Sequence, residues 1–371
     1  MIKNNFYTFY DINRVAPVRI DHKKISNHFK ARKNLYRELS LYDELIRNKE
    51  IIEFGPGSGE NSLFNLNLNP KKYTLVDNSI ACIKTCKKFL KKSPNYKKLL
   101  FKRSKFENFK SKKKYDFVFA ENCIPNNINP KKIYRILTNN VKKGGYFFTT
   151  TTSPVGYFSE ICRKIISHLY LDDDLTFVEK KNFLLKFFDK DLKNLKYLTR
   201  KKEDWIIDNL LQDSGDREMF GLNELLNQKK KFNMMNTYPK FYQNWNWYKD
   251  NQSLSITNFK SSIETSYFKN TMNFLDYNKI YQENSIQFGK NIHDLATQTF
   301  EISKIKDSQI LEKEFRKNIN KFISIIDRKK YSQIYKSLFE VINWLNSRNP
   351  NSLNIFRNWW GRGNIHLIIR Y

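Results

Sequence analysis

Ile51-Ile52-Glu53-Phe54-Gly55-Pro56-Gly57-Ser58-Gly59 is the stretch that decides the fold. An apolar run ends near a carboxylate, Glu53, and three alternating glycines precede a predicted helix. The pattern is typical of a buried strand that turns sharply, because glycine lets a ligand approach bare backbone. The N-terminus of the next helix then offers unpaired N–H groups. A second apolar run, Tyr73 to Val76, ends at Asp77, so the sequence predicts a nucleoside-cofactor site with an acceptor for a ribose diol.

The spacing of the glycines separates two kinds of cofactor. The dinucleotide fingerprint is Gly-x-Gly-x-x-Gly, which places a pyrophosphate on the helix N-terminus. Here the third glycine, Gly59, comes one residue early, and Glu60 stands where that fingerprint has glycine. A carboxylate at this position would repel a diphosphate. The form Glu-x-Gly-x-Gly-x-Gly instead resembles motif I of the class I S-adenosylmethionine-dependent methyltransferases. The resemblance covers about residues 45–155, and in outline the rest of the chain is similar to bacterial members with a helical C-terminal extension.

This resemblance implies S-adenosyl-L-methionine as the cofactor, a ligand that carries a sulfonium and an ammonium but no phosphate. It places the methionine ammonium at Glu53 and the ribose hydroxyls at Asp77. The end of the third strand would flank the adenine. Many relatives carry an acid at the position of Ser104. Phe106 could stack beside the adenine or could equally be a core residue. The cofactor-binding residues implied are Glu53, Gly55, Gly57, Gly59, Asp77, Asn78, Ser104, Phe106 and Glu121.

Glu121 is also the candidate catalytic residue, because it closes the fourth strand beside the expected methyl position. Its carboxylate could accept a proton from a substrate, bind a substrate ammonium or bind the cofactor. The sequence Glu121-Asn122-Cys123-Ile124 differs from the (Asn/Asp)-Pro-Pro-Tyr box of the amino-methylating branch, which argues against methylation of exocyclic base amines. Cys123 is predicted to be a packing thiol. His22 and His28 could lie over the cofactor, although packed or surface positions are the default, and no metal site is expected.

Alternating strands and helices predict an α/β fold, a doubly wound, mostly parallel, Rossmann-like seven-stranded methyltransferase sheet with a large helical addition. Residues 1–49 are expected to form an N-terminal helical lead-in, and 50–170 the S-adenosylmethionine-binding domain. Residues 171–363 are expected to form a mainly helical substrate or cap region, with a possible strand at 232–238. By the resemblance, 364–371 returns as the last, antiparallel strand. The other strands are expected at 50–54, 72–76, 98–103, 115–120 and 145–151, with helices near 59–67, 79–92, 129–140 and 157–170.

Two aromatic clusters lie outside the predicted parallel strands. Six aromatic residues fall among the twelve residues from Tyr238 to Lys249, and Trp359-Trp360-Gly361-Arg362-Gly363 forms the second cluster. They predict a pocket wall or lid for a partly apolar or planar substrate, with Arg362 able to clamp a carboxylate or phosphate. The alternative is that these aromatics form the core of a helical subdomain. The substrate candidates are Tyr242, Trp245, Trp247 and Arg362.

The charge is unevenly placed along the chain. The net charge is +30, and residues 1–150 hold 32 Lys and Arg against 12 Asp and Glu. Such a balance is typical of nucleic-acid partners. However, most of these basic residues are Lys, whereas proteins that bind phosphate groups favour Arg, whose guanidinium can form two hydrogen bonds to one phosphate. The excess is therefore attributed to composition, and a nucleic-acid partner remains a disfavoured alternative.

The sequence therefore favours an S-adenosylmethionine-dependent methyltransferase with a small-molecule, sugar or lipid acceptor, modified on oxygen or nitrogen. An RNA or ribosomal methyltransferase that uses the basic first half is the second hypothesis. A non-catalytic binding protein with a methyltransferase fold is the third, and the intact motif argues against it. No apolar run approaches the ~18 residues of a membrane span. The four cysteines show no Cys-x-x-Cys pattern, and together these features predict a cytoplasmic location.

Overall fold

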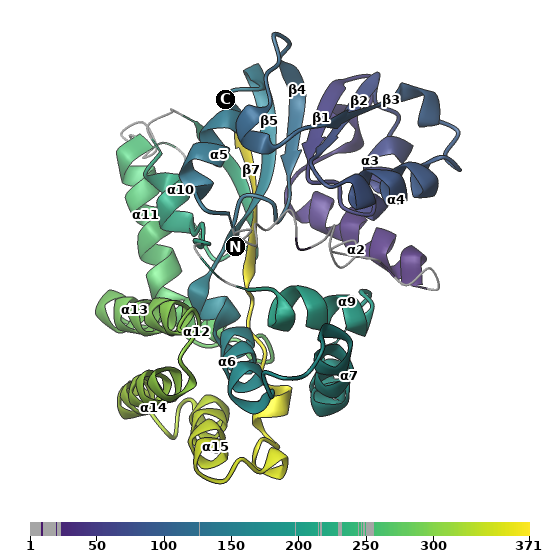
Figure 1. Cartoon of the computed structure of the whole chain (residues 1–371). Coiled ribbons are helices and arrows are strands. Elements are labelled where there is room, and N and C mark those ends of the chain that lie inside the picture. Colours follow the sequence, from purple (N-terminus) through teal and green to yellow (C-terminus); the bar gives the residue numbers. More distant parts are fainter. Residues whose placement is uncertain are drawn as a thin grey trace.

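The computed structural model describes Phe9, Ile20 and residues 24–371, apart from 126, 197, 214, 216, 229–231, 244, 246, 248 and 250–255. Within this part of the chain, seven strands form one sheet in the order β3-β2-β1-β4-β5-β7-β6 (Figure 1). This arrangement confirms the predicted fold class. The strands are β1 (Glu50–Phe54), β2 (Lys72–Asp77), β3 (Leu99–Arg103), β4 (Tyr115–Ala120), β5 (Val141–Thr152), β6 (Asn233–Tyr238) and β7 (Asn364–Arg370).

The strand order fixes where a ligand can bind. Strands β1 to β5 pair in parallel, and β7 lies antiparallel between β5 and β6. The chain runs outward from β1 through β2 to β3, and then returns to the other side of β1 as β4. This reversal is the topological switch point of an open α/β sheet, where the carboxyl ends of the strands border a crevice. The ends of β1 and β4 therefore position the candidate site.

Helices cover both faces of the sheet, as alternate side chains along each strand require. Ile51, Phe117 and Phe148 belong to one core, which is completed by α2 (Ile25–Glu38), α3 (Glu60–Asn67) and α4 (Ile80–Leu90). Their neighbours Ile52, Val118 and Phe147 belong to the second core, together with residues of α5 (Pro130–Thr138). Because both faces are covered, the central strands are apolar almost throughout.

Most of the added helices lie at the carboxyl end of the sheet, below it in Figure 1. Helix α6 (Pro154–Tyr170) begins directly after β5, where Ser153 caps it and Pro154 occupies its first turn. It packs against three later helices, α12 (Thr271–Leu275), α13 (Ile286–Ile302) and α14 (Ser308–Ile325). The remaining helices are α7 (Phe177–Phe187), α8 (Asp189–Asn194), α9 (Lys202–Ile206), α10 (Leu222–Leu226), α11 (Ile256–Lys269) and α15 (Ser332–Ser347). A π-helical turn, Ile207–Leu211, continues α9, and short 3₁₀ turns lie at Asp43–Leu45, Tyr96–Lys98, Phe106–Asn108, Pro350–Ser352 and Phe356–Asn358.

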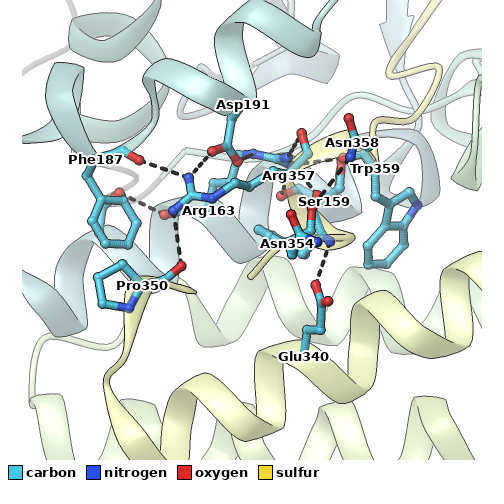
Figure 2. A network of polar contacts seen from close by, with 12 residues as sticks. Ser159, Arg163, Phe187, Asp191, Glu340, Pro350, Asn354, Arg357, Asn358 and Trp359 are labelled. Carbon is cyan, nitrogen blue, oxygen red and sulfur yellow. Dashed lines mark hydrogen bonds and ion pairs between the residues drawn. The ribbon is translucent and has the colours of Figure 1, made fainter. Parts of the chain in front are cut away.

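A buried ionic network ties α6 and α8 to the segment that leads into β7 (Figure 2). Arg163 of α6 donates from Nε to Asp191 Oδ1 at 2.9 Å, and Arg357 forms an ion pair with the other oxygen of Asp191. Arg163 also donates to the carbonyls of Phe356 and Trp359, each at 3.0 Å. All of these groups are buried, so the network fixes the path by which the chain returns to the sheet.

Among the described helices, none combines the length and the apolar character that crossing a bilayer requires.

Candidate functional site

One cavity of about 740 Å³ opens at the carboxyl ends of β1, β2 and β4 and continues into the helical region. On the sheet side it is lined by the glycine loop, by Asp77 and by Glu121. Helix α2 contributes His28 and Arg32 to its wall. On the opposite side, α6 and the π-helical turn supply polar residues such as Glu160 and Asp208. The two halves form one continuous space, which can hold a cofactor and a second molecule together.

The glycine loop is shaped by backbone that other residues rarely adopt. Gly55 and Gly57 have φ angles of +71° and +56° and line the cavity. A Cβ on Gly55 would lie 2.9 Å from Cys123 Cβ, so glycine is also needed for packing there. Gly59 does not line the cavity, and a Cβ on it would lie 2.8 Å from Cys86 Sγ, so it allows α3 and α4 to meet. Ser58 Oγ lines the cavity wall, is buried and has no hydrogen-bond partner among the described residues.

Glu53 lines the cavity with one carboxylate oxygen engaged. Its Oε2 accepts hydrogen bonds from Ser62 Oγ at 2.7 Å and from the Tyr73 hydroxyl. No described residue donates to its Oε1, which leaves this oxygen for a ligand. Burial raises the pKa of Glu53 to about 7, although the hydrogen bonds from Tyr73 and Ser62 act in the opposite direction. A ligand cation at this point would favour the ionised carboxylate.

Of the other predicted cofactor-binding residues, some line the cavity and others do not. Asp77 lines the cavity, and its Oδ1 accepts from the backbone N–H of Ser79 at 2.9 Å. Phe106 also lines it and packs edge-to-face against Phe54. Asn78 and Ser104 do not line it: the Asn78 carbonyl accepts from Arg103, and the Ser104 hydroxyl donates to a backbone carbonyl beside it. Asp77 and Phe106 therefore meet the glycine loop, whereas Asn78 and Ser104 support the turns around it.

Glu121 is not a suitable catalytic base, which corrects the sequence prediction. Arg32 of α2 donates to both of its carboxylate oxygens, at 2.5 and 2.7 Å. Burial alone would raise the pKa of Glu121, but the charge and hydrogen bonds of Arg32 lower it below its usual value. A general base should have a pKa near the working pH. Glu121 therefore anchors α2 over the cavity. Arg32 also donates to the Tyr36 hydroxyl at 2.8 Å, which strengthens this anchor.

None of the four predicted substrate residues lines this cavity. Tyr242 packs edge-to-face against Phe259, while the side chains of Trp245 and Trp247 are 90% and 59% exposed. The Arg362 guanidinium donates to backbone carbonyls of Asp276 and Tyr277 at 2.7 and 2.9 Å, so it fixes a loop and cannot clamp a substrate. Trp359 and Trp360 are fully buried core residues. The core alternative for the second aromatic cluster is the one that the structure supports.

Two histidines in the cavity wall come from distant segments. His28 Nε2, on α2, lies 2.9 Å from Asn61 Oδ1. His22, the other histidine that the sequence placed near the cofactor, lies outside the described residues. His366 of β7 is half-buried, and the burial of its ring lowers its pKa to about 4. Its Nδ1 has no hydrogen-bond partner among the described residues. Within the described part of the chain, no three His, Cys, Asp or Glu side chains gather in a way that could hold a metal.

The helical half of the cavity contains polar residues that the sequence prediction missed. Glu160 and Lys164 stand one turn apart on α6, and Gln212 and Arg217 follow the π-helical turn. Burial raises the pKa of Glu160 to about 7, and no described residue forms a hydrogen bond or ion pair with its carboxyl group. The sequence feature that could have indicated them is the i, i+4 spacing of Glu160 and Lys164, which places both side chains on one face of the helix after β5.

The methyltransferase-domain family model matches residues 46–240 of the chain. Similar solved structures include PKMT2 from Rickettsia typhi in complex with AdoHcy, with 16% identity, a TM-score of 0.38 and coverage of 58% of this chain and 46% of that one. The CcbJ methyltransferase from Streptomyces caelestis shows 18% identity and a TM-score of 0.28, with coverage of 30% and 47%. A putative methyltransferase from Thermoplasma acidophilum shows 23% identity and a TM-score of 0.26, with coverage of 28% and 44%. The chain thus spans less than half of each of these proteins. No protein with a curated description matches the chain.

Proposed function

Because the chain belongs to the methyltransferase-domain family and uses S-adenosylmethionine, we propose that it methylates an oxygen or nitrogen of a small-molecule, sugar or lipid acceptor. The acceptor class is inferred from the continuity of the cavity. The glycine loop and the side chains of α6 line the same space, which α2 borders through Arg32. A cavity of about 740 Å³ has the size of a small-molecule site.

The residues on the sheet side of the cavity fit S-adenosylmethionine. Among the described residues, four carboxylates line this half, those of Glu53, Glu60, Asp77 and Glu121. Arg32 of the same half pairs with Glu121, so the carboxylates there outnumber the arginines. This charge suits a cationic ligand and disfavours a diphosphate. Glu53 Oε1 would accept from the methionine ammonium and Asp77 from the ribose hydroxyls, with Phe106 beside the adenine. When bound, the cofactor supplies a methyl group activated by its sulfonium.

The chain's own residues have two further tasks in this proposal. Methyl transfer to an activated carbon depends mainly on positioning in a dry site. The Arg32–Glu121 ion pair holds α2 at the cavity wall and limits the access of water. Glu160 replaces Glu121 as the candidate proton acceptor, because no described residue pairs with its carboxyl group and its pKa of about 7 suits a general base.

The acceptor class can be tested with a methyl-labelled donor. The protein is incubated with the donor and a cell extract, which is then divided into nucleic-acid, protein, lipid and small-molecule pools. We expect label in the small-molecule or lipid pool. The Glu160→Gln variant should transfer less label than the wild type, although the two proteins bind S-adenosylhomocysteine equally. Label confined to the RNA pool would favour the ribosomal alternative and contradict this proposal.

The affinity for S-adenosylhomocysteine is expected to increase as the pH rises from 6 to 8. The pKa of Glu53 is about 7 in the ligand-free protein, and the ligand ammonium would lower it. Binding must therefore release a proton below pH 7, which costs affinity there, whereas above pH 7 Glu53 is already ionised. Calorimetry across this range measures the effect. His28 also lines the cavity, so Glu53→Gln is the matched control: it should bind more weakly at pH 8 and lose most of the pH dependence. A wild-type affinity that stays constant would contradict this role of Glu53.

A further inference from the structure

The helical end of the cavity contains a connected group of hydrogen-bond donors, formed by Lys164, Gln212 and Arg217. Lys164 Nζ donates to the backbone carbonyl of Gln212 at 2.6 Å. Arg217 Nη1 donates to Gln212 Oε1 at 2.8 Å, which orients the amide of that side chain. Gln212 is 4% exposed, and its Nε2 has no hydrogen-bond partner among the described residues. All three residues line the cavity, so this buried donor lies where a ligand could satisfy it.

The two carboxylates whose charges act on Lys164, those of Asp208 and Asp213, are paired with other cations. Asp208 pairs with Arg200 at 2.8 Å, and Asp213 pairs with Lys306 at 2.6 Å. Across the described residues, no carboxylate lies within ion-pair distance of Lys164. Burial, followed by the charge of Arg217, lowers the pKa of Lys164 to about 7. An anion placed between these donors would satisfy Gln212 Nε2 and favour the charged form of Lys164.

We propose that Lys164, Gln212 and Arg217 bind an anionic group of the methyl acceptor, a carboxylate or a phosphate. The inference rests on the proposed function only in identifying the ligand as the acceptor. A guanidinium, an ammonium and an amide N–H together match the oxygens of such a group. Glu160 stands one turn before Lys164 on the same helix and also lines the cavity. The acceptor is therefore a small anion whose hydroxyl or amine lies on the Glu160 side.

The test measures the binding of two simple anions, inorganic phosphate and succinate, to the full chain saturated with S-adenosylhomocysteine. Titration calorimetry should show saturable binding of at least one probe, and the tighter probe identifies phosphate or carboxylate as the group. Loss of one charged hydrogen-bond donor costs roughly 1.5–3 kcal/mol, so Lys164→Met should weaken the preferred anion about 10- to 100-fold. Gln212→Glu, which replaces the free donor by a carboxylate, should abolish binding.

Lys97→Met is the matched control, because Lys97 is an exposed lysine in the turn before edge strand β3, does not line the cavity and contributes to the same net charge. Its affinity for both anions should equal that of the wild type. Equal affinity in Lys164→Met and the wild type, or no saturable binding of either probe to the wild type, would overturn the proposal. Unchanged affinity of Lys164→Met for S-adenosylhomocysteine shows that the variant is folded. If S-adenosylhomocysteine fails to bind while anions still depend on Lys164, the cofactor assignment fails and the anion site stands.

Discussion

Replacing Asp191 by asparagine is expected to lower the free energy of unfolding by about 3–5 kcal/mol, because two buried guanidinium groups lose the one carboxylate that pairs with them among the described residues. Arg163 is fully buried, and the Arg357 side chain is 10% exposed. The substitution keeps the shape of the side chain, so the effect reports on the charge. The carbonyls of Phe356 and Trp359 would still accept from Arg163, but they cannot neutralise it. Urea unfolding, followed by circular dichroism, measures the change.

The control is an exposed ion pair on the same protein. Glu301, near the end of α13, pairs with Lys304 just beyond that helix, and the glutamate side chain is 60% exposed. Exposed pairs contribute roughly 0–1 kcal/mol, so Glu301→Gln should leave the stability almost unchanged. A loss below about 1 kcal/mol in Asp191→Asn would show that the network is replaceable, as some buried ion pairs are. The expected result is that Asp191→Asn unfolds at a clearly lower urea concentration than Glu301→Gln.

The parts of the fold that follow from local patterns were predictable. The strand from Glu50 to Phe54 and its glycine loop were read from a few adjacent residues, because a turn at positive φ needs glycine at defined places. The last strand, Asn364–Arg370, is also present, and it was placed by resemblance to the family. Its length is apparent from its apolar residues, but its position between β5 and β6 depends on pairing across more than 100 residues.

The candidate site was predictable only where neighbours in sequence are also neighbours in space. Glu53 and Asp77 end adjacent parallel strands, so their convergence follows from the sheet. Glu121 ends β4 as expected, but its partner Arg32 lies 89 residues away on α2, and no local pattern connects them. The position of the aromatic residues could not be predicted for a different reason, because amino-acid composition does not distinguish a pocket wall from a core. Trp359 and Arg362 are held by contacts with the loop around residue 275, which only the folded chain reveals.

Asp77→Ala is expected to weaken the binding of S-adenosylhomocysteine about 100-fold, because the ribose hydroxyls would lose a charged acceptor. A hydrogen bond to a charged group contributes roughly 1.5–3 kcal/mol, and about 1.4 kcal/mol corresponds to tenfold in affinity. Asp77 Oδ1 also accepts from the N–H of Ser79, so the alanine variant disturbs the turn as well. Asp77→Asn keeps an acceptor for that N–H, and it should lose affinity less severely, about 10-fold.

The role of Asp77 in binding the ribose can be separated from its role in the turn by changing the ligand. An analogue of S-adenosylhomocysteine without the two ribose hydroxyls should bind the wild type about 100-fold more weakly, but should lose little further affinity in Asp77→Ala. Such non-additivity is expected only if the carboxylate and the hydroxyls contact each other. Asp116→Asn is the control, since Asp116 pairs with Lys142 near the amino end of β4, away from the cavity. If the losses from the analogue and from Asp77→Ala add in full, Asp77 acts through the turn and the ribose contact is wrong.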